Sequence, residues 1–180
     1  MIAKEKHTVW FLEMVSSDQL RKKEWKYLES QFELRNVSDY RINKKMYEQV
    51  GGPWQWNDRL VWSDHQWQSY AQRPDILTSV ASVNGREIGY VERRMELPKE
   101  IQIEYFGLHP ECMGKGYGGY FLSVALEECW RLRPGRIWVH TCSYDGPAAL
   151  QNYLARGFEV FEERVFMPGE EIDEELSSGQ

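Results

Sequence analysis

Cysteine is scarce in this chain of 180 residues, which has only Cys112, Cys129 and Cys142. The odd count and the lack of a secretory pattern argue against a disulfide framework. His109 with Cys112, and His140 with Cys142, do not have the ligand spacing of zinc sites. We therefore expect no disulfide and no metal, and we expect Cys129 to lie on the buried face of a helix.

An excess of basic charge and long hydrophobic runs are missing as well. Lys and Arg number 22 against 28 Asp and Glu, so the net charge is −6. Nucleic-acid binding depends on a clustered basic surface, and a membrane helix needs about 20 apolar residues. Neither feature is present, and residues 1–6 carry no apolar leader. The expectation is a cytoplasmic protein without nucleic-acid or membrane partners.

The length and the 42% of hydrophobic residues are typical of one globular domain. No repeat or linker divides the chain. We expect a single domain over residues 1–167, with halves of about 1–75 and 76–167. An acidic tail, residues 168–180, is expected to be solvated and mobile.

The first half predicts one strand, at residues 8–14, and three helices. Each helix is marked by small polar residues that can accept the free amides of a first turn. The helices are expected from Ser17 and Asp18 to about Ser30, from Ser38 and Asp39 to Gly51 and Gly52, and from Ser63 and Asp64 through Trp67 and Tyr70.

The second half predicts strands and helices in alternation. Asn84 and Gly85 tolerate positive φ and predict a hairpin turn. Strands are expected at 76–83, 87–95, 101–108, 137–141 and 158–166, and helices at about 118–133 and from Asp145 or Gly146 to Gly157. The fold class is therefore α/β (α+β), a mixed, mostly antiparallel central sheet flanked by helices.

A glycine-rich loop, residues 113–119, lies between a predicted strand and a predicted helix. Glycines let successive amides turn toward one point, and the following helix adds the positive end of its dipole. Together they form an anion site suited to a pyrophosphate.

Three familiar nucleotide loops do not fit these residues. Gly114, Gly116 and Gly119 match GxGxxG, but no acid follows the next strand as a dinucleotide site requires. Gly116 follows Lys115 where a Walker loop needs Ser or Thr. No segment typical of a protein kinase follows.

Two stretches resemble motifs of the GCN5-related N-acetyltransferase (GNAT) family. They are GLHPECMGKGYGGYFL at residues 107–122 and DGPAALQNYLARGF at residues 145–158. With the strand between them, the resemblance covers about residues 101–166. It implies an acyl-CoA N-acyltransferase fold and transfer of an acetyl group from acetyl-CoA directly to a primary amine, which the sequence does not identify.

The resemblance also implies how the cofactor binds. The strand ending at Leu108 would separate from the next strand and pair its backbone with the pantetheine arm, while the loop amides would hold the pyrophosphate. The half 76–167 would bind acetyl-CoA and the half 1–75 would shape the acceptor site. The expected cofactor-binding residues are Phe106, Leu108, Met113, Gly114, Lys115, Gly116, Tyr117, Gly118, Gly119 and Asn152.

Two catalytic residues follow from the resemblance. Tyr153 falls on a tyrosine that gives a proton to the leaving thiolate; the alternative is an aromatic that only packs on the sheet. Glu104 is the candidate base; the alternatives are a surface ion pair and a water chain. The two-residue period of a strand places Gln102, Glu104, Phe106 and Leu108 on one face.

The chain departs from the family pattern at three places. Met113 stands where Gln or Arg is usual, with Lys115 as the expected substitute for the anion contact. Gly146 stands where an Asn commonly touches the cofactor. One closing strand is predicted where two are frequent.

A tryptophan-rich segment occupies residues 53–67. An aromatic cage for a cationic amine is one interpretation, with Trp54, Trp56 and Arg59 as acceptor-binding residues; a satellite core is the other. Two further classes stay open, a non-catalytic CoA-binding or sensing module and an interaction protein that uses the tryptophan surface. A homodimer is a further possibility, as dimers are common in this fold.

Overall fold

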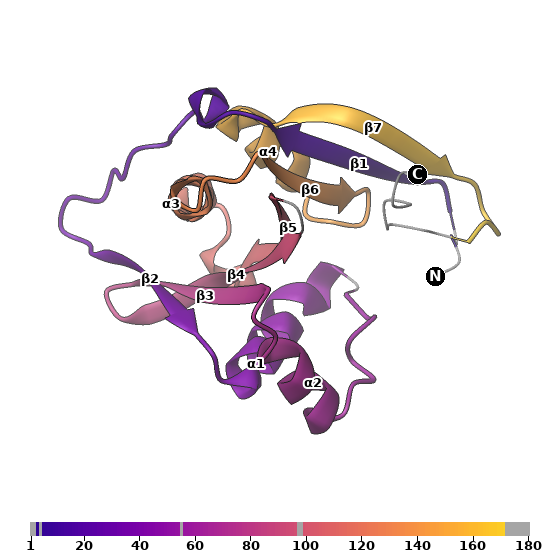
Figure 1. Cartoon of the computed structure of the whole chain (residues 1–180), viewed down its shortest axis with the longest axis horizontal. Coiled ribbons are helices and arrows are strands. Elements are labelled where there is room, and N and C mark those ends of the chain that lie inside the picture. Colours follow the sequence, from indigo (N-terminus) through magenta and orange to yellow (C-terminus); the bar gives the residue numbers. More distant parts are fainter. Residues whose placement is uncertain (1–2, 4, 55, 97–98, 172–180) are drawn as a thin grey trace.

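The computed structural model describes residues 3, 5–54, 56–96 and 99–171. These residues form one sheet with helices on both of its faces (Figure 1). The strands are β1 (His7–Met14), β2 (Phe32–Val37), β3 (Ile76–Val83), β4 (Arg86–Glu96), β5 (Glu100–Leu108), β6 (Arg136–Cys142) and β7 (Glu159–Phe166). The α-helices are α1 (Tyr40–Gly51), α2 (Asp64–Ala71), α3 (Tyr117–Arg131) and α4 (Ala149–Arg156), with 3-10 turns η1 (Ser17–Gln19), η2 (Gly52–Trp54) and η3 (Pro110–Cys112).

The strand order is β2-β3-β4-β5-β6-β1-β7. Every neighbouring pair is antiparallel except β5 and β6, which run parallel. The predicted fold class, a mixed and mostly antiparallel sheet flanked by helices, is confirmed.

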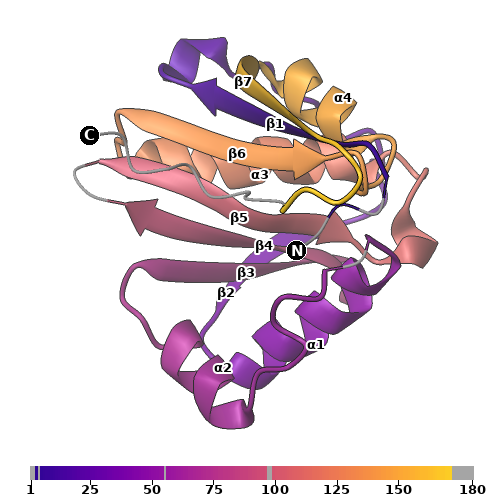
Figure 2. The ribbon, with the colours of Figure 1, turned by 90° about the vertical axis from the view of Figure 1, so that its right-hand side faces the viewer.

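Two hydrophobic cores lie on opposite faces of the sheet. The larger core joins α3 and α4 to the central strands and includes Phe121, Cys129 and Tyr153. The smaller core joins α1 and α2 to β3 and β4 around Met46 and Trp67. Figure 2 shows α3 behind β5 and β6, and α1 and α2 below β3. The expected burial of Cys129 is confirmed.

The N-terminal strand β1 is inserted between β6 and β7. A strand therefore lies beside β7, as in a closing pair, but it comes from the other end of the chain. The backbone of Ala3 also pairs with Gly169 and Glu170, at N–O distances of 2.8 and 2.9 Å. This pairing attaches the first residues of the expected acidic tail; residues 172–180 lie outside the described part of the chain.

The predicted helix from Ser17 to Ser30 is wrong. Ser16 and Gln19 form a capping box, but the helix stops after η1. Residues 20–31, the β1–β2 linker, must then reach the far edge of the sheet, about five strand spacings or 24 Å away. A helix over residues 18–30 would advance only about 20 Å. The linker therefore runs extended and leads into β2, a strand that the sequence analysis missed.

Most other expected elements are confirmed within one or two residues at their ends. Asp39 and Ser63 cap α1 and α2 through their side chains, as predicted. The expected cap of α4 at Asp145 or Gly146 is wrong, because the helix begins at Ala149 without a side-chain cap. The Asp145 carboxylate instead accepts hydrogen bonds from the Thr141 hydroxyl and the Cys142 amide.

Candidate functional site

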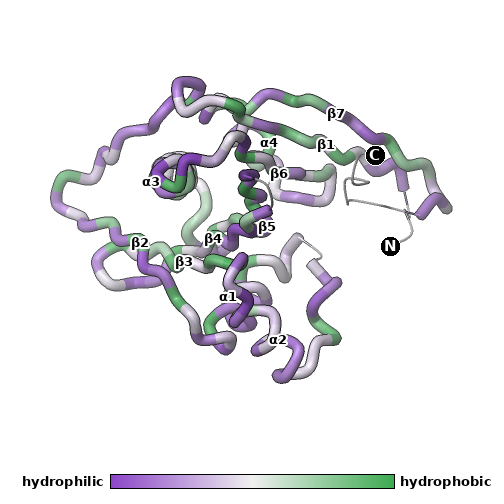
Figure 3. Tube along the Cα trace, viewed as in Figure 1, coloured by the Kyte–Doolittle hydropathy of each residue, from purple (hydrophilic) through white to green (hydrophobic). Residues whose placement is uncertain are grey.

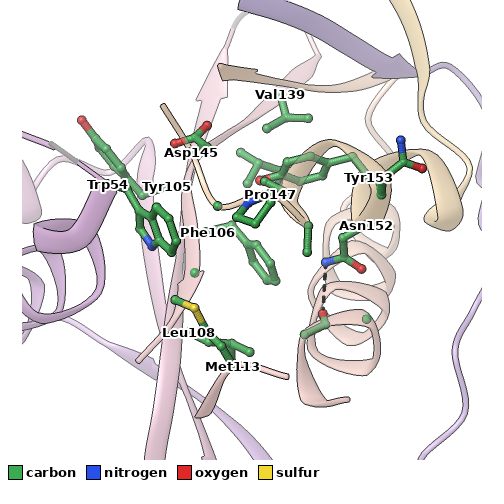
Figure 4. Close-up of a pocket in the computed structure, with 18 of the residues that line it drawn as sticks. Trp54, Tyr105, Phe106, Leu108, Met113, Val139, Asp145, Pro147, Asn152 and Tyr153 are labelled. Carbon is green, nitrogen blue, oxygen red and sulfur yellow. Dashed lines mark hydrogen bonds between the residues drawn. The ribbon is translucent and has the colours of Figure 1, made fainter. Parts of the chain in front are cut away.

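The parallel strands β5 and β6 separate halfway along their length. Their register runs from Glu100 opposite Arg136 to Ile103 opposite Val139, and the pairing ends there. Beyond this point β5 continues to Leu108 without a partner on that side. A cavity of about 800 Å³ opens in the gap, bounded by both strands, the glycine loop and α4 (Figure 4). The strand separation that the resemblance implied is therefore present.

A β-bulge in β5 lies at the point of separation. Tyr105 is opposite Glu92 and Ile103 is opposite Arg93, which leaves Glu104 as the extra residue. A bulge adds one residue to one strand and interrupts the two-residue alternation of its side chains. The cavity therefore begins where the faces of β5 are exchanged.

The expectation that Gln102, Glu104, Phe106 and Leu108 share one face is wrong because of this bulge. Phe106 and Leu108 pack on the α3 side of the sheet. Gln102 and Glu104 lie on the opposite side, where both approach the Arg94 guanidinium. Phe106 and Leu108 line the cavity from β5 (Figure 4).

The glycine loop leaves backbone amides free at the start of α3. Gly114 and Gly116 have φ of 70° and 81°, in the left-handed region that favours glycine. Gly116 is the N-cap of α3 and offers no side-chain cap to the first amides. Such amides, with the positive end of the helix dipole, suit an anion.

Five of the seven expected loop residues line the cavity, namely Met113, Gly114, Gly116, Gly118 and Gly119. Lys115 and Tyr117 do not. The Lys115 carbonyl accepts a hydrogen bond from the Tyr27 hydroxyl, and the Tyr117 ring stacks on Trp25. The expected substitution of Lys115 for an anion contact at Met113 does not fit this placement.

Helix α4 closes the cavity opposite β5. The Asn152 amide donates a 3.4 Å hydrogen bond to the Gly118 carbonyl, which joins α4 to the first turn of α3 (Figure 4). Tyr153 is 5% exposed, and its ring lies near those of Phe106 and Phe158. Its hydroxyl points into the cavity on the side of Asp145 (Figure 4). Burial raises the pKa of Tyr153, so the hydroxyl keeps its proton at neutral pH.

Arg59 lies under the cavity wall and not in the cavity. The buried guanidinium donates to Glu92 at 2.7 Å, to the Tyr70 hydroxyl at 2.9 Å and to Glu104 at 3.1 Å. The Tyr105 ring covers it as well. Direct contact between Arg59 and an acceptor does not fit this placement, because its donors already serve buried acceptors.

Glu104 is both an ion-pair member and a wall of the cavity. Its carboxylate is 3.1 Å from Arg59 and 3.6 Å from Arg94. Burial raises the pKa of Glu104, while the two guanidinium groups oppose that shift. The ion pair that was the alternative to a base is thus present, and Glu104 is also among the residues that line the cavity.

The tryptophan-rich segment divides between the two interpretations. Trp67 lies in the smaller core, and the Trp62 ring packs against it and against Tyr70. Trp54 and Trp56 line the cavity. The segment is therefore a satellite core whose two leading rings reach the site.

Glycines make room for these two rings. A Cβ on Gly51 would lie 2.1 Å from the Trp56 ring, and one on Gly146 would lie 3.2 Å from Trp54. The Trp56 indole N–H also approaches the Asp145 carboxylate at 3.5 Å. Gly146, where the family pattern commonly has Asn, thus provides space for Trp54.

Three charged groups at the cavity were missed by sequence analysis: Lys23, Asp145 and Arg156. Arg156 lies inside the α4 motif but follows no pattern that predicts a contact. Asp145 had been interpreted as a helix cap, and Lys23 as part of a helix. Only the path of the β1–β2 linker brings Lys23 to this site.

A parallel strand pair that separates beside a glycine loop, within a seven-stranded mixed sheet, defines the acyl-CoA N-acyltransferase fold. The sequence profile of the Acetyltransferase (GNAT) family matches residues 38–158, about two thirds of the chain. The chain therefore belongs to the GNAT acetyltransferase family. No protein with a curated description matches the sequence.

Solved structures share this fold at low sequence identity. A GCN5-related N-acetyltransferase from Sphaerobacter thermophilus has a TM-score of 0.66 and 16% identity, covering 93% of this chain and 54% of that one. An IAA acetyltransferase from Bacillus cereus has a TM-score of 0.55 and 23% identity, covering 73% of this chain and 79% of that one. A conserved protein of unknown function from Staphylococcus epidermidis has a TM-score of 0.60 and 19% identity, covering 89% of this chain and 60% of that one. This chain thus spans little more than half of two of these proteins.

Two features of the described residues bear on metal binding and on membranes. No group of His, Cys, Asp and Glu side chains in this part of the protein is arranged to hold a metal ion. None of the helices described above is both long and apolar enough to cross a membrane.

Proposed function

We propose that this protein transfers an acetyl group from acetyl-CoA to a primary amine. The observation that carries the proposal is the cavity in the gap between β5 and β6, with free amides at one end and aromatic and acidic side chains at the other. Such a site can hold a long cofactor with an anionic end and present its reactive end to a second substrate.

The residues present fit acetyl-CoA. The loop around Gly114 and Gly116 would hold the pyrophosphate, because its amides and the α3 dipole favour an anion. The unpaired edge of β5 from Tyr105 to Leu108 would bind the amides of the pantetheine arm. Bound there, the thioester supplies the acetyl group that the amine receives.

Tyr153 would hold the proton needed at the departing sulfur. Its hydroxyl faces the cavity, and its raised pKa keeps it protonated. A proton donor placed at a leaving group accelerates its departure. The rings of Phe106 and Phe158 hold the Tyr153 ring in place.

Glu104 would take the proton that the amine loses. A carboxyl group with a raised pKa is a better proton acceptor near neutral pH than an ordinary one. Arg59 and Arg94 would act as positioning residues, because they orient the Glu104 carboxylate without lining the reaction path. A water chain that ends at Glu104 would serve the same purpose.

Trp54, Trp56 and Asp145 would receive the acceptor. Ring faces and a carboxylate both favour a cationic amine, and the three side chains lie together at one side of the cavity. The ammonium form would bind there before it loses its proton.

The first test is a thermal melt with and without saturating acetyl-CoA, followed by thiol release with a panel of primary amines. A ligand at about 100 times its Kd stabilises the native state by about 2.7 kcal/mol, which gives a clear rise in Tm. A rise without amine-dependent thiol release would favour a CoA-sensing module. No rise would reject the cofactor site and favour an interaction surface.

A further inference from the structure

Two cations stand at the cavity without carboxylate partners. Lys23 comes from the β1–β2 linker and Arg156 from the last turn of α4, and both line the cavity. Among the described residues, neither has an ion pair. The neighbouring Lys22, in contrast, pairs with Glu127. Burial alone lowers the pKa of the Arg156 guanidinium, since no carboxylate compensates its charge.

The linker is held along α3, which places Lys23 by backbone contacts. The Lys23 amide donates to the Ser123 hydroxyl at 2.9 Å, and the Tyr27 hydroxyl donates to the Lys115 carbonyl. The linker is mainly hydrophilic (Figure 3), and Leu20 and Trp25 pack against the larger core. Its attachment leaves the Lys23 ammonium free for another partner.

Arg156 is oriented in the same way by the linker. Its Nε donates to the Arg21 carbonyl at 3.0 Å, and its carbonyl accepts from the Arg21 amide at 2.9 Å. These contacts use the Nε edge of the guanidinium and leave its Nη atoms without a hydrogen-bond partner among the described residues. Arg156 and Lys23 therefore approach the start of α3 from two elements that meet only in the folded chain.

Gly119 lets both cations come close to the free amides of α3. A Cβ at this position would lie 2.3 Å from Arg156 Nη1 and 2.7 Å from Lys23 Cδ. Gly119 is the third residue of the helix, so its amide is among those without a partner in the first turn. The two cations and the amides thus converge on one place.

A small pocket continues from this place along the linker. It has a volume of about 190 Å³ and is lined by Lys23, Glu24, Trp25, Lys26, Tyr27, Gly116 and Tyr120. Aromatic rings of this kind can pack against a nucleotide base. The nucleotide end of a cofactor therefore has a path beyond the glycine loop.

We propose that Lys23 and Arg156 bind the pyrophosphate of the cofactor together with the glycine-loop amides. They replace the side-chain contact that Met113 does not make, and they make the β1–β2 linker part of the cofactor site. This inference rests on the proposed function, because it concerns the same ligand. A charged hydrogen bond contributes more than a neutral one, so each residue matters for affinity.

The test compares the affinities of three ligands by isothermal titration. Acetyl-CoA has both the pyrophosphate and the 3′-phosphate, acetyl-dephospho-CoA has only the pyrophosphate, and acetyl-pantetheine has neither. The variants are Lys23→Gln, Arg156→Gln and the control Arg21→Gln, which removes one charge from the same linker but does not line the cavity. Lys23→Gln retains the backbone bond to Ser123 and so tests the proposal without a change in fold.

We expect Lys23→Gln and Arg156→Gln each to weaken both phosphate-bearing ligands about tenfold, because a hydrogen bond to a charged group is at stake. The control is expected to bind like wild type, and acetyl-pantetheine to bind all proteins equally. The affinity of wild type for acetyl-CoA should also fall more steeply with salt than that of either variant.

Normal binding by both variants would overturn the proposal. A loss seen with acetyl-CoA but not with acetyl-dephospho-CoA would also overturn it, since the cations would then hold the 3′-phosphate. Failure of wild type to bind acetyl-CoA at all is a different result, which rejects the proposed function itself.

Discussion

Arg59 and Arg156 occupy two regions built in opposite ways. Arg59 lies beneath α1 and α2, where Glu92, Glu104 and Tyr70 take up its donors. Arg156 lies at the start of α3, where glycines expose amides and where no carboxylate of the described residues forms an ion pair with its guanidinium. A fully partnered charge stabilises the fold, whereas an unpartnered charge beside free amides is available to a ligand.

The largest expected effect tests the region around Arg156, where the amides of the glycine loop are free. Gly116→Val places a branched side chain at φ of 81° and 2.9 Å from the Tyr27 hydroxyl, so the amide nest cannot form. We expect acetyl-CoA binding to fall by about a thousandfold or more, measured by isothermal titration. Gly85→Val is the control, since Gly85 also has positive φ but lies in the hairpin turn. Normal binding by Gly116→Val would show that the loop is not the anion site.

The region around Arg59, where the charge is fully partnered, is tested by Arg59→Met. The variant leaves Glu92 buried without its cation and Glu104 with Arg94 alone, and removal of one partner from a buried pair costs about 3–5 kcal/mol. We expect the free energy of unfolding in urea to fall by that amount. Arg41→Met, at an exposed pair with Asp39, should change it by less than about 1 kcal/mol. Equal small losses would mean that Arg59 is not a structural residue.

Tyr153→Phe asks whether a buried residue of the larger core also takes part in catalysis. General acids contribute about 10²–10⁴-fold, so we expect kcat to fall at least about 100-fold while the Kd of acetyl-CoA stays within about threefold. A thiol-release assay gives kcat, and isothermal titration gives the Kd of acetyl-CoA. Comparable losses in both would assign Tyr153 to packing alone.

The pH dependence of Glu104 joins the two regions. Because burial raises its pKa above the ordinary value of 4.5, activity should decrease as the pH falls through that raised value. We expect Glu104→Gln to lower kcat/KM about tenfold or more and to remove this acid limb. A limb that remains in the variant belongs to the acceptor amine. For stability the sign is opposite: the contribution of Glu104 is present below its ordinary pKa and is lost as the pH rises through the raised one.

The smallest effect separates the two kinds of tryptophan. Trp54→Ala should raise the KM for the acceptor by about fivefold with little change in Tm, since a cation–π contact at a partly exposed site contributes about 1 kcal/mol. Trp67→Ala should instead cost about 3–5 kcal/mol of stability. Unchanged acceptor kinetics in Trp54→Ala would place the acceptor elsewhere.

Sequence reasoning succeeded where a short segment acts through its own backbone. The glycine loop, the hairpin at Asn84 and Gly85, and the caps Asp39 and Ser63 follow from local conformational preferences. The predicted helix after Ser17 failed because its end must reach a distant strand, which is a constraint that no local window contains. The prediction of one shared face along β5 failed for a similar reason, since only pairing with Glu92 and Arg93 reveals Glu104 as an extra residue.

The sequence by itself determined the sheet class and the loop that can hold an anion, because these depend on periodicity and on glycine positions close together in the chain. It also indicated the family, through the resemblance of residues 107–122 and 145–158 to the GNAT motifs. Tertiary structure alone decided which charges are partnered. Lys23 and Arg156 meet beside Gly119, and Arg59 meets Glu92 and Glu104, only after distant segments pack. Whether a charged side chain supports the fold or faces a ligand depends on its neighbours in space, which the order of residues does not reveal.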